Sequence, residues 1–220
     1  FNLDAALRLA TSHSMLGRDA QALSMFKRAA EIAPQSQDVR LYLALHQERG
    51  RNWQQAVPTL ERIVAETPDR LPPVEALARV RERQGRIEDA VTLWQRVMTL
   101  RAPAPSDHVK LGELAMSIGN TPVALAAFEQ ARHSQGDAFR HDLELGVLYF
   151  AARQYPQARE ALDRVPASHP EYPMVLFKRA QVSVLLKEPD AAERIRRARQ
   201  RADSSTRELM ANERLFAPSR

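Results

Sequence analysis

The 220-residue sequence contains no cysteine. This absence excludes disulfide frameworks, zinc sites held by thiolates and cysteine nucleophiles. Glycine is scarce, with seven residues that stand singly, so no glycine-rich loop can cradle a phosphate. No apolar run reaches the length of a membrane-spanning helix, and no signal-peptide pattern opens the chain. Because the first residue is Phe1 rather than methionine, the compartment stays open between cytoplasm and periplasm.

Patterns for catalysis and metal binding are also lacking. None of the six histidines pairs with another at a spacing of four residues, and no His-Glu-x-x-His pattern is present. The nearest approach to a metal cluster is His141-Asp142 with Glu144, but adjacent residues on a helix point in different directions. Serine, histidine and aspartate occur without the motif context of a catalytic triad. We therefore expect no enzymatic activity, no bound metal and no cofactor.

Lysine is rare, because only four of the 32 basic residues are lysines, and the net charge is +5. The densest basic run extends from Arg194 to Arg201. One interpretation is a surface that contacts the phosphates of nucleic acid or of anionic lipid. The other is the solvated face of a helix. No aromatic residue interleaves with these arginines, which argues against a stacking platform for single strands.

What the sequence does contain is a repeat of 34 residues. Small residues recur at this interval, at Ala22, Ala56, Ala90, Ala124, Ala158 and Ala192. Large apolar residues follow four positions later, at Phe26, Leu60, Trp94, Phe128 and Leu162. A leucine followed by alanine or glycine returns upstream with the same period. Apolar residues at this spacing predict one face of an amphipathic helix, and a fixed period of this length indicates stacked helical units.

These columns resemble the tetratricopeptide repeat (TPR) family, whose 34-residue unit is a helix-turn-helix. The resemblance covers residues 3–202 and implies an all-α fold, a right-handed superhelix of the α-solenoid type. We expect one solenoid domain over residues 1–220, with six repeats at about 1–34, 35–68, 69–102, 103–136, 137–170 and 171–203. The sixth repeat departs from the pattern, because Arg179 replaces the leucine of its pair and the apolar residue after Ala192 has moved to Ile195.

Cap and turn residues predict where helices begin. Ser36 and Thr121 are expected helix caps, because a hydroxyl can accept an unpaired N–H of the first turn. The proline-rich connector 101–106 keeps the period, so we interpret it as an inter-repeat turn rather than a domain linker. Ser205-Thr-Arg-Glu208 is a capping-box pattern. It predicts a terminal helix over about 205–216 that covers the last repeat.

The resemblance implies that the first helix of each repeat lines a concave binding surface. Family members that grip a C-terminal carboxylate carry lysine, arginine and asparagine there, but this chain has residues such as Leu7, Thr11 and Leu41 in those places. The candidate groove residues are instead an apolar group and a charged group: Val109, Met116, Leu143, Val147, Phe150 and Phe177, and Arg49, Glu75, Arg79 and Arg83. Exposed apolar patches usually mark contact sites. The alternative is that neighbouring repeats or the terminal helix cover this strip.

The sequence thus predicts a non-catalytic scaffold that binds a peptide or helix of a protein partner in its concave groove. Two alternatives stay open. In the first, the chain is the TPR portion of a larger bacterial enzyme or of a polysaccharide-export or assembly protein. In the second, it binds nucleic acid through the C-terminal arginines. Nucleic acid is the disfavoured partner, and no insertion into a membrane is expected.

Overall fold

The computed structural model of the chain describes residues 3–136 and 140–216. In these ranges it is built from α-helices with no strand, so the expected all-α fold is confirmed. None of the described helices is both long enough and apolar enough to cross a membrane. The bounds are α1 (Leu3–Met15), α2 (Asp19–Ile32), α3 (Gln37–Arg49), α4 (Trp53–Glu66), α5 (Leu71–Arg83), α6 (Ile87–Leu100), α7 (Pro105–Ser117), α8 (Thr121–Gln135), α9 (Asp142–Ala151), α10 (Tyr155–Arg164), α11 (Tyr172–Leu185), α12 (Ala191–Arg201), α13 (Ser204–Ala211) and the 3₁₀ helix η2 (Arg214–Phe216).

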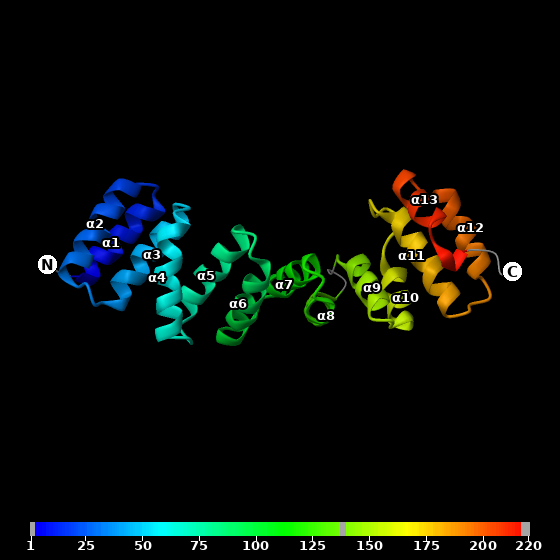
Figure 1. Ribbon diagram of the computed structural model, residues 1–220, viewed down its shortest axis with the longest axis horizontal. Coiled ribbons are helices and arrows are strands. Elements are labelled where there is room, and N and C mark those ends of the chain that lie inside the picture. Colours follow the sequence, from blue (N-terminus) through cyan, green and yellow to red (C-terminus); the bar gives the residue numbers. More distant parts are fainter. Residues whose placement is uncertain (1–2, 137–139, 217–220) are drawn as a thin grey trace. The chain divides into compact units, whose positions relative to one another are not determined.

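The helices group into two compact units, unit 1 over residues 1–104 and unit 2 over 105–220. Within each unit they form consecutive pairs that pack side by side, such as α1 on α2 and α9 on α10 (Figure 1). That the two units form one six-repeat domain stays a prediction. The expected start of repeat five at 137 and the ends of the chain, 1–2 and 217–220, lie outside the described residues.

Small residues lie where the paired helices approach each other. The alanine column is fully buried in the first five repeats, at Ala22, Ala56, Ala90, Ala124 and Ala158. In unit 2 the leucine-glycine pairs are tighter still. A Cβ added to Gly112 would lie 2.9 Å from the ring of Phe128, and one added to Gly146 would lie 2.7 Å from Cγ of Leu162. In the pairs α7–α8 and α9–α10, a methyl group at these positions would therefore force Phe128 or Leu162 to move.

The turn between the two helices of each repeat uses one residue in the left-handed conformation. Three repeats use glycine, with φ of +71°, +73° and +70° at Gly17, Gly85 and Gly119. The other three place a long basic residue there, with φ of 59°, 59° and 56° at Arg51, Arg153 and Lys187. A side chain in this conformation costs about 1–2 kcal/mol. The six positions keep the 34-residue period, so the turn geometry is retained even where the glycine is not.

The helix caps agree with the sequence in one repeat and differ in another. Ser36 caps α3 as expected, since its hydroxyl accepts a backbone N–H three residues later at 3.4 Å. The expected cap Thr121 is instead the first residue of α8. Asn120 caps that helix, because its side-chain carbonyl accepts a backbone N–H at 3.4 Å. The prediction of Thr121 as the cap was therefore wrong, because the amide of the preceding residue takes that place.

The C-terminal segment differs from the single helix expected over 205–216. The cap of α13 is Asp203 rather than Ser205, because the Asp203 carboxylate accepts the N–H of Thr206 at 2.8 Å. The helix ends at Ala211, and the chain then turns into η2, so the expected helix is divided in two. Both pieces lie against α11.

The sixth repeat contains the expected helix pair, α11 and α12, but its register has slipped. Ala192, which the period places in the buried column, is exposed. Ala198 and Ala202 are buried instead, and Ile195 packs against the same cluster. The helix begins at Ala191 after a longer turn than in the other repeats, and this turn rotates its packing face.

Candidate partner-binding surface

The apolar candidates of repeat five lie on α9. Leu143 is 6% exposed, whereas Val147 and Phe150 are half-buried. All three pack into a cluster built by α9, α10 and α11. The ring of Phe150 also meets that of Tyr155 edge-on, with 5.8 Å between the centroids. Val147 and Phe150 are therefore partly open to solvent, and Leu143 supports them from inside.

A lysine that the sequence patterns did not indicate joins Phe150 to Phe177. The ammonium of Lys178 on α11 lies 4.9 Å from the ring centroid of Phe150 and 5.4 Å from that of Phe177. Burial lowers the pKa of Lys178, and the charge of Glu213 acts in the opposite direction. A cation over an aromatic face is attracted by the ring's negative π surface. The two aromatic residues expected in the groove are thus brought together around one cation.

Phe177 is placed differently from an open groove residue. Its side chain is 4% exposed, and its ring meets that of Phe216 edge-on at 5.8 Å. Met210 and Leu215 of the C-terminal segment belong to the same cluster. The structure therefore corrects the placement of Phe177 and Leu143, which lie beneath the surface. The C-terminal segment, which the repeat period does not specify, covers Phe177, whereas the cluster of α9, α10 and α11 covers Leu143.

The remaining apolar candidates, Val109 and Met116, lie on α7. Val109 is half-buried and Met116 is 38% exposed. Neither belongs to the apolar clusters that contain Leu143 and Phe177. Met116 and Phe150 are 34 residues apart and share one repeat position. That these side chains face one another stays a prediction from the period.

Three of the four charged candidates in unit 1 form an ion network around Glu48. The Glu48 carboxylate is 9% exposed and lies 3.3 Å from Nε of Arg79 and 3.6 Å from Nη1 of Arg83. Arg79 also lies 3.8 Å from the carboxylate of Glu75. The structure thus brings Glu75, Arg79 and Arg83 of α5 together around Glu48 of α3. The shielded acid at the centre of the network explains why two arginines converge there.

Arg49 belongs to a different group, which links α1 to α3. Its Nη1 donates to the hydroxyl of Ser14 at 3.0 Å, and this hydroxyl lies 2.8 Å from Nδ1 of His46. Burial lowers the pKa of His46, and Arg49 adds to this effect against the opposing charge of Asp19. Arg49 is therefore engaged within unit 1 through a neutral partner rather than through the Glu48 network.

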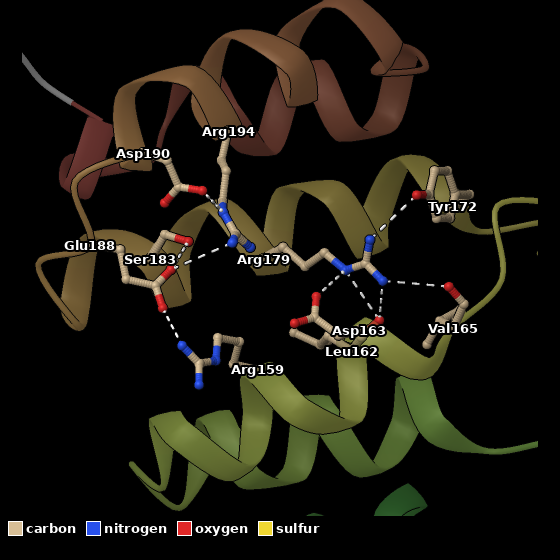
Figure 2. Close-up of polar contacts among 10 residues, drawn as sticks. All are labelled: Arg159, Leu162, Asp163, Val165, Tyr172, Arg179, Ser183, Glu188, Asp190 and Arg194. Atoms are coloured by element: carbon tan, nitrogen blue, oxygen red, sulfur yellow. Dashed lines mark hydrogen bonds and ion pairs between the residues drawn. The ribbon is translucent and has the colours of Figure 1, made fainter.

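Figure 2 shows why an arginine is suited to the leucine position of repeat six. Nε of Arg179 donates to the carbonyl of Leu162 at 3.1 Å, and Nη1 lies 3.3 Å from the hydroxyl of Tyr172. The guanidinium also lies 3.1 Å from the carboxylate of Asp163. The last carbonyls of a helix have no partner within the helix and carry the negative end of its dipole. Arg179 satisfies the end of α10 and so replaces an apolar contact by a polar one.

A second polar group in Figure 2 centres on Glu188, in the turn before α12. Its carboxylate accepts hydrogen bonds from the Ser183 hydroxyl at 2.8 Å and from Arg159 at 2.7 Å. Arg194 lies 3.8 Å away. Burial opposes the ionisation of Glu188, but the hydrogen bonds from Ser183 and Arg159 outweigh it and hold its pKa below the ordinary 4.5. One carboxylate thus joins α10, α11 and α12.

The exposed side of α12 is strongly basic. The helix carries five arginines and one glutamate among its 11 residues. Arg194 lies 2.8 Å from the carboxylate of Asp190. Within residues 3–136 and 140–216, no ion pair involves the other four, which are all exposed: Arg196, Arg197, Arg199 and Arg201. These four side chains are available to an anionic partner.

Two arginines bind the aspartate of His141-Asp142 with Glu144, the group that came nearest to a metal site in the sequence. Nη1 of Arg132 and Nε of Arg164 each lie 2.9 Å from Oδ1 of Asp142. Nδ1 of His141 lies 3.8 Å from the carboxylate of Glu144. In the part of the chain that the structure describes, no three histidine, aspartate or glutamate residues come close enough to hold a metal ion.

Comparisons with known proteins agree with the helix pairs described above. Two family models described as tetratricopeptide repeat match the chain, one over residues 15–80 and the other over the overlapping stretches 109–173 and 143–206. The chain belongs to the tetratricopeptide repeat family. A search of curated proteins gave no significant match.

Solved TPR structures resemble the chain over most of its length. MamA (AMB-1) is 18% identical with a TM-score of 0.61, covering 74% of this chain and 88% of its own. YrrB, described as a TPR protein with an unusual peptide-binding site, is 10% identical with a TM-score of 0.62, covering 86% and 98%. PilF of Pseudomonas aeruginosa is 19% identical with a TM-score of 0.52, covering 96% and 97%. At these identities the likeness shows the TPR fold alone.

Proposed function

We propose that this TPR chain is a non-catalytic protein-interaction scaffold whose unit 2 binds a peptide or helix of a protein partner. The observation that carries the proposal is the cation held between two aromatic rings, where Lys178 lies over Phe150 and Phe177. Aromatic residues at the centre of a contact surface provide much of the binding free energy in protein complexes. The description of YrrB as a TPR protein with a peptide-binding site supports this kind of ligand.

The candidate residues have different roles in this binding surface. Met116, Val147 and Phe150, which keep some solvent exposure, contact the partner directly. The buried side chains of Leu143 and Phe177 support these contact residues from inside unit 2. The remaining candidates contribute an apolar margin on α7 and a separate charged surface in unit 1: Val109, Arg49, Glu75, Arg79 and Arg83.

Site-specific photocross-linking in the source cell tests this surface. The cross-linking residue replaces Met116 or Val147, and in the control it replaces Glu160, whose side chain is 76% exposed on α10. We expect discrete cross-linked products at the first two positions that are absent at the third. Identical products at all three positions, or no product at any of them, contradict the proposed surface.

A second candidate function, nucleic-acid binding, rests on the unpaired arginines of α12. Their side chains lie on one short helix and lack acidic partners among the described residues: Arg196, Arg197, Arg199 and Arg201. Phosphate contacts release counterions, so the affinity must fall steeply as salt is raised. Titration of mixed-sequence oligonucleotides at several salt concentrations tests this, with Arg197→Gln expected to reduce the salt slope by about one. Binding that is absent at low salt, or insensitive to salt, excludes the second candidate.

A further inference from the structure

The C-terminal segment, residues 203–216, folds back onto the surface that the proposed function assigns to a partner. Both α13 and η2 lie against α11 (Figure 1). The ring of Phe216 is 8% exposed and meets Phe177 edge-on at 5.8 Å. Met210 is 6% exposed in the same cluster. An aromatic side chain from elsewhere in the sequence therefore already occupies this part of the surface.

A polar contact accompanies the aromatic one. The Glu213 carboxylate accepts a hydrogen bond from the side-chain amide of Gln181 on α11. Its charge also acts on Lys178, the cation that lies over Phe150 and Phe177. Glu213 and Phe216 thus approach α11 together, one as an acid and the other as an aromatic ring.

The side-chain oxygen of Gln181 accepts no hydrogen bond from the C-terminal segment. The residue is 5% exposed, and its Oε1 has no hydrogen-bond partner among the described residues. A buried acceptor without a donor costs roughly 1–3 kcal/mol. A bound peptide carries backbone N–H groups that can satisfy this oxygen. A displacing peptide can therefore make a hydrogen bond on α11 that the C-terminal segment does not make.

The C-terminal segment is short enough to detach from α11. α13 has eight residues, and η2 has three. Helices this short are marginal in water without their tertiary contacts. Short segments open locally at a smaller free-energy cost than global unfolding, and opening here exposes the buried side chains of Thr206, Met210 and Phe216. The segment can therefore leave α11 while the helix pairs of unit 2 stay folded.

We propose that residues 213–216 act as an internal ligand, and that α11 takes from a protein partner a peptide in which an acidic residue precedes an aromatic residue by three positions. Glu213 and Phe216 have this spacing and serve as the template. The inference rests on the proposed function, because it names the chemistry of the partner for the same surface. It adds regulation: the partner binds by displacing the chain's own C-terminal segment, so its apparent affinity is reduced while that segment is seated.

A labelled peptide with the sequence of residues 203–216 tests the inference on the 220-residue chain. We expect weak binding to the wild type and binding about tenfold tighter to the double variant Glu213→Ala, Phe216→Ala, whose own segment no longer competes. Leu209→Ala is the matched control, because that side chain is 47% exposed on α13 and should leave the affinity unchanged. Lys178→Met, added to the double variant, should weaken binding again, since it keeps an unbranched stem but removes the cation.

A measurement on the wild type tests the inference even if the double variant is poorly folded. Excess peptide added to the wild type should speed amide hydrogen exchange in residues 204–211, and a peptide lacking the acidic and aromatic residues should not. Equal affinities for the wild type and the double variant, together with unchanged exchange, overturn the inference and leave the segment as a structural cap. The photocross-linking at Met116 decides the proposed function separately, so either result can fail alone.

Discussion

One position of the repeat is acidic in the second and third repeats, in unit 1, and apolar in the fourth and fifth, in unit 2. Glu48 and Glu82 occupy it in unit 1, and Met116 and Phe150 occupy it in unit 2, each 34 residues after the last. In unit 1 the acid is bound by arginines, with Arg79 at 3.3 Å from Glu48. In unit 2 Phe150 packs with other rings and a lysine.

This difference shows that the scaffold and the surface are specified by different residues. The small-residue column is buried in the first five repeats, at Ala56 in unit 1 as at Ala124 in unit 2. It positions the helices whatever the surface carries. Contacts that depend on charge should respond to salt, and contacts that depend on apolar burial should not.

The largest effect is expected at Phe177 in unit 2. Phe177→Ala removes a ring that is 4% exposed and in contact with Phe216, so it should lower the free energy of unfolding by about 3 kcal/mol. Equilibrium urea denaturation measures the loss. Leu209→Ala is the control, because its side chain is 47% exposed and its effect should stay within about 0.5 kcal/mol. Similar losses for the two variants would show that the aromatic contact does not stabilise unit 2.

Gly146→Ala should come next, because it tests the closer approach of helices in unit 2. The added methyl group would lie 2.7 Å from Cγ of Leu162, and overpacking of this kind costs about 1–3 kcal/mol. The same position holds a fully buried alanine, Ala78, in unit 1. Comparing urea midpoints of Gly146→Ala and wild type checks the effect. An unchanged midpoint would mean that Leu162 moves aside without cost.

A smaller effect, sensitive to salt, is expected at Glu48 in unit 1. Glu48→Gln removes the charge that Arg79 and Arg83 share, and both arginines keep substantial exposure, so the loss should be about 1 kcal/mol at low salt. Raising the salt concentration should reduce the loss, because screening already weakens the wild-type pairs. The matched variant in unit 2 is Phe150→Leu, whose effect should not change with salt. A salt-independent loss at Glu48 would remove the contrast between the units.

The smallest effect concerns pH and Glu188. Its pKa in the folded chain is below the ordinary 4.5, so its stabilising contribution is complete above that pH and is lost as the pH falls through the folded value. Because Arg159 is partly exposed, the contribution should be under about 1 kcal/mol. We expect the stability difference between wild type and Glu188→Gln to stay constant down to about pH 5 and then to shrink. A difference that grows on acidification would reverse the assigned direction.

The repeat architecture was predictable because its residues act locally and at a fixed interval. The alanine column located the helix contacts, and Ser36 marked a true cap. Residue type indicated only the three turns that contain glycine, since Arg51, Arg153 and Lys187 adopt the left-handed conformation at the other three. Regular spacing therefore predicts the helix pairs better than residue type predicts the turns between them.

The candidate site was less predictable, because it depends on contacts between segments that no period links. Lys178 reaches Phe150 from a neighbouring helix, and Phe216 covers Phe177 from the C-terminal segment. A helical-face argument identified Phe150 and Phe177 as surface candidates but could not show which of them another segment would cover. Glu213 and Gln181 carried no sequence signal for the same reason.

Arg179 has a consequence for how the molecule opens. In addition to the apolar cluster that α10 and α11 share, its guanidinium makes a charged contact with the end of α10, through the carbonyl of Leu162 and the carboxylate of Asp163. Salt weakens such a charged contact, whereas it leaves buried apolar contacts almost unaffected. The last helix pair is therefore the part of unit 2 whose protection from solvent exchange should decline first as ionic strength rises. The helices of unit 2 would then separate first at this pair, because its charged contact is lost while the buried alanine contacts stay intact.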